Sequence, residues 1–140
     1  MVKSRISSAL SQYQRVSVSS GVEDATPHRL IQMLMEGALD KIATAKGHML
    51  HHEPAEKGRH ISWAISIVSG LQSSLDLEAG GDISRNLDDL YDYMVRRLGE
   101  AGMKDDPSIL DEVTSLLLEL KSAWDVIPRQ LAAENKRAAS

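Results

Sequence analysis

The positions of the four prolines constrain the fold of this chain more than any other feature of its sequence. Proline is tolerated in the first turn of an α-helix but breaks a helix interior. Three of the prolines follow a polar residue that can cap a helix, and the fourth ends the last apolar segment. They stand in the pairs Thr26-Pro27, Glu53-Pro54 and Asp106-Pro107, and at Pro128. Because no proline interrupts an apolar segment, the spacing predicts three long helices that begin at the three pairs.

Two adjacent glycines mark the start of a further helix. Gly80 and Gly81 tolerate positive φ, and glycine loses more conformational entropy in a helix than other residues do. Asp82 follows, where its carboxylate can accept from the free amides of a first turn. We therefore predict helices over 27–50, 54–77, 82–101 and 107–127, the third ended by a left-handed glycine at Gly102. Short connections between long helices favour antiparallel neighbours, so the predicted fold class is an all-α, antiparallel up-down four-helix bundle.

Each predicted helix carries one stripe of apolar residues at three- and four-residue steps. At about 100° per residue, such residues share one face of a helix and can meet a core. The stripes comprise Leu30, Ile31, Leu34, Met35, Ala38, Ile42, Ala45 and Met49; Ile61, Ala64, Ile65, Val68, Leu71 and Leu75; Ile83, Leu87, Leu90, Tyr91, Met94, Leu98 and Ala101; and Ile109, Val113, Leu116, Leu117, Leu120, Trp124 and Ile127. The pattern predicts a core built from one stripe of each helix.

With 140 residues, the chain is long enough for one domain with a sizeable core. Residues 1–22 are rich in serine, carry no acidic residue, and have few apolar anchors, among them Tyr13 and Val16. We expect a mobile N-terminal arm at 1–22, the bundle domain at 23–128, and a frayed or disordered tail at 129–140.

Composition excludes several classes of function. A net charge of -4 gives no support for nucleic-acid binding, for which a basic face is expected. The absence of cysteine excludes disulfides and thiol catalysis. No apolar run approaches the roughly 18 residues of a membrane span, so we predict no membrane insertion. The first residues lack the apolar core of a secretory signal, and we therefore expect a cytoplasmic protein.

A cluster of histidines at the first helix-to-helix junction is the strongest candidate for metal chemistry. His48, His51 and His52 precede Glu53, and His60 follows. The sequence identifies no partner that would orient these rings, and the di-iron pattern Glu-x-x-His is absent. We interpret the cluster as a polar surface junction, and the exposed acidic pairs as solvated faces. We therefore predict no metal, no cofactor, no catalytic residue, and a protein that is not an enzyme.

Several large apolar residues fall outside the stripes. They are Leu39, Trp63, Ile67, Tyr93 and Leu118. Scattered exposed apolar residues are normal on protein surfaces and need no explanation one by one. As a set, they favour a wide core or a groove that binds another helix.

Two longer motifs carry a family resemblance. The segments LDLEAGGDI and NLDDLYDYM in the middle of the chain and TPHRLIQMLMEGAL upstream, with Trp124 near the end, resemble the flagellar secretion chaperone FliS family. The resemblance covers residues 13–127. It implies a cytoplasmic export chaperone that holds the disordered C-terminal segment of flagellin against the outside of the bundle. It further implies that binding prevents premature polymerisation and assists delivery to the flagellar type III export apparatus.

The partner-binding residues that we predict combine the arm, the off-stripe residues and the resemblance. They are Tyr13, Val16, Leu39, Trp63, Ile67, Tyr91, Tyr93 and Leu118. Tyr91 has two interpretations at this point, a core tyrosine or the floor of a partner groove, and Trp63 could instead form a self-association patch. Whether the free chain forms a weak homodimer therefore stays an open question. The alternative function is a helical adaptor or regulatory protein that binds another amphipathic helix.

Overall fold

The structure is a computed structural model that describes residues 25–127 of the chain. The predictions about the arm at 1–22, with Tyr13 and Val16, and about the tail at 129–140 lie outside the described residues. The described part consists of four helices and contains no strand. The helices are α2 (Pro27–Leu50), α3 (Pro54–Ser73), α4 (Gly81–Lys104) and α5 (Pro107–Asp125). The prediction of an all-α four-helix bundle is confirmed.

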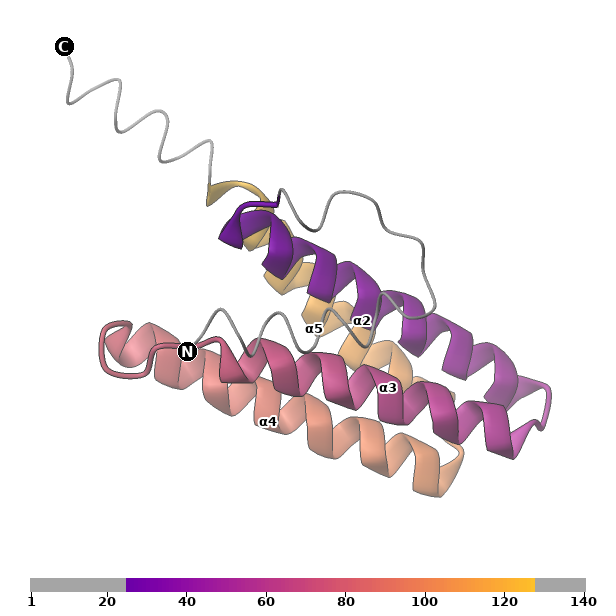
Figure 1. Ribbon diagram of the computed structural model, residues 1–140. Helices are drawn as coiled ribbons and strands as arrows, with labels where there is room; N and C mark the ends of the chain where they lie inside the picture. The colour runs from indigo at the N-terminus through magenta and orange to yellow at the C-terminus, as the bar shows by residue number, and fades with distance from the viewer. Residues whose placement is uncertain (1–24, 128–140) are drawn as a thin grey trace, which may run out of the picture.

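The four antiparallel helices form two layers (Figure 1). α2 packs against α3 and α5, and α4 packs against the same two helices. The α2–α5 layer and the α3–α4 layer lie close together at the end that holds the α2–α3 connection (Figure 1). They diverge toward the other end, where α2 and α4 begin and α3 and α5 end. Within residues 25–127, none of the helices combines the length and the apolar content that a membrane crossing requires.

Two of the four residues predicted to cap a helix, Thr26 and Asp106, do so. The Thr26 hydroxyl accepts from the Arg29 amide at 3.1 Å. The Asp106 carboxylate accepts from the Ser108 amide at 2.9 Å and from its hydroxyl at 2.6 Å. These hydrogen bonds, that of the hydroxyl first, hold the pKa of Asp106 below its usual value. Glu53 makes no side-chain cap, because its carboxylate lies beside His48 instead.

The corner between α3 and α4 is longer than predicted. α3 ends at Ser73, and the Asp76 carboxylate accepts from the amides of Glu78 and Ala79, which forms a turn outside the helix. Gly80, not Asp82, is the N-cap residue of α4. A side chain at Gly80 would lie 1.7 Å from the Ser84 hydroxyl oxygen, so this close approach requires glycine. Gly81 adopts positive φ (55°), as its type allows.

α4 also ends later than predicted. The helix continues past Gly102 to Lys104, and Asp105 adopts the left-handed conformation with φ 50°. Aspartate is one of the few residues besides glycine that visit this region. The Lys57 ammonium donates to the Gly102 carbonyl at 3.1 Å and pairs with the Asp105 carboxylate. These two contacts of Lys57, a residue of α3, therefore stabilise the additional turn of α4.

The predicted stripes form most of the core. Every residue of the predicted α2 stripe is buried, and each of the other helices buries at least three residues of its own stripe. Ile83 is an exception at 74% exposed. Gln72, in the last turn of α3, already contacts Asp88 and Asp92, so Ile83 lies beyond the end of α3.

The prediction that Ile67 lies on the outer surface is wrong. The Ile67 side chain is 1% exposed and belongs to the core. Counting at about 100° per residue places Ile67 only about 60° from Ala64, on the edge of the stripe rather than opposite to it. α3 packs against both α2 and α4, so its buried arc is wider than one stripe. Leu110, which belonged to no predicted stripe, is fully buried in α5 for the same reason.

We predict that Ile67→Ala lowers the free energy of unfolding by about 2–5 kcal/mol, because the substitution leaves a cavity in the core. Leu118→Ala is the matched control, since Leu118 is 50% exposed and its truncation should change stability by less than about 0.5 kcal/mol. Urea denaturation of the two variants measures both values. Equal losses would contradict the placement of Ile67 in the core.

Candidate functional site

An apolar cavity of about 610 Å³ lies at the divergent end of the bundle. Its lining comes from α2, α4 and α5 and from residues that flank the helices. The lining residues are Thr26, Pro27, His28, Ile31, Met35, Ser74, Leu75, Asp76, Leu87, Tyr91, Leu120, Trp124 and Ile127. Asp76 is the one carboxylate in this lining, and most of the other side chains are apolar. Such a site is suited to apolar side chains rather than to an ion or a sugar.

One wall of the cavity is held by a reciprocal pair of hydrogen bonds between α2 and α5. The Trp124 indole N–H donates to the His28 carbonyl at 3.0 Å, and the His28 Nε2–H donates to the Trp124 carbonyl at 2.7 Å. The two rings stack with their centroids 5.0 Å apart and 5° between their planes. Close by, the Gln32 amide donates to the Asp125 carboxylate at 2.7 Å. These contacts fix the start of α2 to the end of α5.

Tyr91 connects the cavity to the core. The residue is buried in α4 and also lines the cavity, so the two interpretations of Tyr91 describe one position. Burial raises the pKa of the Tyr91 phenol to about 12. Leu87 lies one turn earlier on the same face of α4, and the exposed Ile83 lies one turn before Leu87. This face of α4 therefore presents an apolar row from the buried core to the solvent.

Tyr93 lies away from the cavity, on the α4–α5 interface. Its hydroxyl donates to Glu112 at 3.0 Å, and the Arg97 guanidinium donates to the other carboxylate oxygen at 2.7 Å. These hydrogen bonds, that of Arg97 first, hold the pKa of Glu112 below its usual value. The hydrogen bond to Glu112 raises the pKa of Tyr93. The Tyr93 side chain is thus engaged in a polar network between two helices.

The remaining predicted contact residues are spread over the bundle. Leu39 and Trp63 are half-buried against the core, and Leu118 is exposed on α5. The Lys41 ammonium lies 4.0 Å from the centre of the Trp63 ring. None of these residues lines the cavity, so Tyr91 is the one predicted contact among the described residues that does.

Most of the apolar residues that line the cavity belong to the predicted core stripes. Leu87, Leu120 and Trp124 follow the helical period, but they are half-buried where the two layers diverge. The period indicates which face of a helix is apolar, and it carries no information about where the neighbouring helix ends. The contact between His28 and Trp124 that marks this end of the bundle joins residues 96 positions apart, so no local pattern in the sequence indicates it.

Comparison with known proteins identifies the family of this chain. A family model described as "Flagellar protein FliS" matches residues 9–131. The chain belongs to the FliS family. Among its relatives, the flagellar secretion chaperone FliSB of Pseudomonas aeruginosa is 53% identical over 119 residues, which cover 85% of this chain and 94% of the relative.

Further FliS relatives extend over similar lengths. The flagellar secretion chaperone FliS of Vibrio cholerae is 43% identical over 86% of this chain and 88% of its own. That of Salmonella typhimurium is 39% identical over 93% of this chain and 97% of its own. FliS proteins form a family of non-enzymatic chaperones, so the prediction that this protein is not an enzyme is confirmed.

Tyr91 should make the stability of the protein sensitive to alkaline pH. The phenol releases its proton near pH ~10 in the unfolded chain, but only near pH 12 in the folded protein. Because the folded-state pKa is the higher one, the stability linked to this proton is present below about pH 10 and is lost as the pH rises toward 12. Tyr91→Phe has no proton to release, so its free energy of unfolding should fall less steeply over this range.

Urea denaturation at a series of pH values measures the two slopes. Tyr93 is retained in both proteins, so its own raised pKa contributes equally to each. Parallel slopes for the wild type and Tyr91→Phe would contradict the desolvation of the Tyr91 phenol.

Proposed function

We propose that this FliS protein is a cytoplasmic export chaperone that binds the C-terminal segment of flagellin in the apolar cavity. By covering that segment it prevents premature polymerisation, and it assists delivery to the flagellar export apparatus. The observation that carries the proposal is the apolar cavity at the divergent end of the bundle, which Tyr91 lines. The names of the FliS relatives, which are flagellar secretion chaperones, support the choice of a flagellar partner.

The chemistry of the cavity favours an amphipathic segment. Such a segment binds by laying its apolar face into an apolar groove. A segment that is disordered when free loses conformational entropy as it becomes ordered, so the net affinity depends on the apolar area that is covered. The same apolar face drives association between flagellin chains, and a chaperone that occupies it blocks that association.

The proposed contacts combine the cavity with an outer surface. Tyr91, Leu87 and Leu120 form the central contacts, because they line the cavity. Leu118 is proposed to extend the contact along α5, and Leu39, Trp63 and Tyr93 stay proposed peripheral contacts. Ile67 is no longer proposed, since a core residue is not accessible to a partner.

The arm at 1–22 is proposed to occupy the same cavity in the free protein and to be displaced by flagellin. Tyr13 and Val16 motivate this proposal, because they are apolar residues in a largely polar segment. Deletion of 1–22 should then change the affinity for flagellin. An unchanged affinity would exclude this competition without affecting the cavity itself.

Calorimetric titration with the C-terminal segment of a flagellin tests the central proposal. We expect saturable binding with a negative change in heat capacity, the sign of apolar burial. Leu87→Asp should weaken binding by at least about tenfold, because it places a charge in the cavity lining. Leu50→Asp is the matched control: Leu50 is an exposed leucine at the opposite end of α2, and its substitution should leave the affinity unchanged.

Circular dichroism first establishes that each variant is folded. Wild-type affinity in a folded Leu87→Asp would overturn the cavity as the binding site. Equal binding of an unrelated amphipathic helix would favour the alternative, a general helical adaptor. A Leu118→Asp variant tells whether the segment continues along the outer face of α5.

A further inference from the structure

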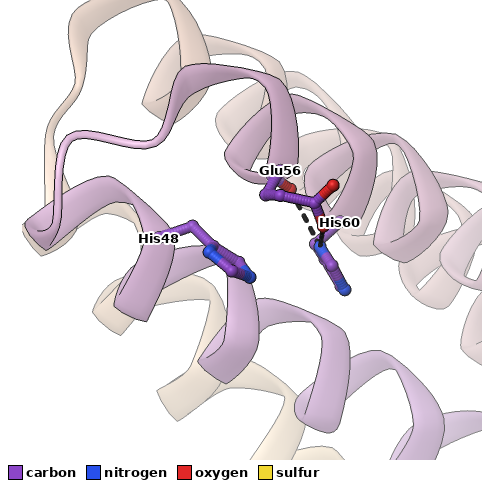
Figure 2. A group of neighbouring side chains, drawn as sticks. All are labelled: His48, Glu56 and His60. Atoms are coloured by element: carbon purple, nitrogen blue, oxygen red, sulfur yellow. Dashed lines mark hydrogen bonds and ion pairs between the residues drawn. The ribbon is translucent and has the colours of Figure 1, made fainter.

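Three side chains with metal-binding atoms converge at the end of the bundle opposite the cavity. His48 lies in the last turn of α2, and Glu56 and His60 lie in the first turns of α3. One ligand atom of each residue lies within 4.8 Å of those of the other two. Figure 2 shows the two imidazole rings on either side of the α2–α3 junction, with Glu56 next to His60. Glu56 and His60 are four residues apart and therefore share one face of α3.

Both histidines have one ring nitrogen already engaged. His60 is 7% exposed, and its Nδ1–H donates to the Glu56 carbonyl at 2.8 Å. The His48 Nδ1–H donates to the Glu53 carboxylate at 3.1 Å. In a neutral imidazole whose Nδ1 carries the proton, Nε2 keeps its lone pair for a ligand. Histidines that bind metals almost always have such a carbonyl or carboxylate partner. The orienting partners that the sequence analysis could not identify are therefore present.

We propose that His48, Glu56 and His60 form a binding site for a divalent cation of the Zn²⁺ class. Two imidazole nitrogens and one carboxylate oxygen are a donor set typical of zinc, with a fourth position left for water. This assignment replaces the interpretation of the junction as a merely polar surface. It is independent of the proposed flagellin site, because the two sites occupy opposite ends of α2 and α3.

Local geometry and charge define what binding requires. The ring centroids of His48 and His60 lie 5.2 Å apart, with 29° between the ring planes. Because the rings are stacked, the His48 ring must turn before the Nε2 lone pairs of both histidines can point at one cation. His48 is only half-buried, which permits this rotation. The Arg59 guanidinium lies 2.7 Å from the Glu56 oxygen that faces His60, so the carboxylate must turn to present its other oxygen to the cation.

A cation at this site would connect the end of α2 to the beginning of α3. Metal binding to the folded state alone stabilises that state by mass action. We therefore expect zinc to raise the unfolding temperature without creating an enzymatic activity. Since the cavity lies at the other end of the helices, zinc should leave the affinity for flagellin unchanged.

The test is a calorimetric titration of the full chain, carrying no histidine tag, with ZnCl₂ in a buffer that does not bind metals. We expect one saturable site and a rise in unfolding temperature on zinc addition. His48→Ala and Glu56→Gln should each weaken binding at least tenfold and abolish the temperature rise. Both residues are partly exposed, so these variants should fold, whereas a substitution of the buried His60 could fail to fold.

His51→Ala is the matched control. His51 is exposed in the same junction but lies outside the three-residue group, so its removal should leave zinc affinity unchanged. The absence of saturable binding to the wild type would overturn the proposal. So would wild-type affinity in His48→Ala and Glu56→Gln, or an equal loss in His51→Ala. None of these results tests the flagellin proposal, which is tested separately by the calorimetric titration with the flagellin segment.

Discussion

The contact between His28 and Trp124 determines the shape of the end of the bundle that carries the proposed function. Two hydrogen bonds, each from a ring N–H to the other residue's carbonyl, and a stacked pair of rings join the start of α2 to the end of α5. α3 ends at Ser73 and is followed by a turn held by Asp76. At this end the α2–α5 layer is therefore fixed as a unit while the α3–α4 layer diverges from it (Figure 1).

This divergence accounts for the apolar cavity. At this end of the bundle, apolar side chains of α2, α4 and α5 line the space between the layers. No residue of α3 lines this space, because α3 ends at Ser73. Apolar surface left in contact with water is unfavourable by about 25 cal/mol per Å² relative to burial. The core around Met94, Leu98 and Leu117 provides the stability, since these residues are fully buried. The cavity beside it provides apolar surface that a partner can cover.

Sequence reasoning predicted the parts of the fold that depend on local chemistry. Thr26 and Asp106 cap their helices because a hydroxyl or carboxylate before a proline satisfies free amides wherever the helix lies. Parts that depend on neighbours were missed. Ile67 is buried because α3 has two partners, and position 80 requires glycine because Ser84 approaches it closely. Tyr91 lines the cavity and belongs to the core, but the cavity itself depends on where α3 ends, which no periodicity encodes.

The most direct test of the central claim is to observe the bound segment in contact with the cavity. We would label the protein and the flagellin C-terminal segment with different isotopes and record intermolecular nuclear Overhauser effects to the Tyr91 and Trp124 rings. The account predicts effects between these two rings and apolar methyl groups of flagellin. Effects confined to the outer faces of the helices, with the Tyr91 and Trp124 signals unchanged on saturation, would contradict it.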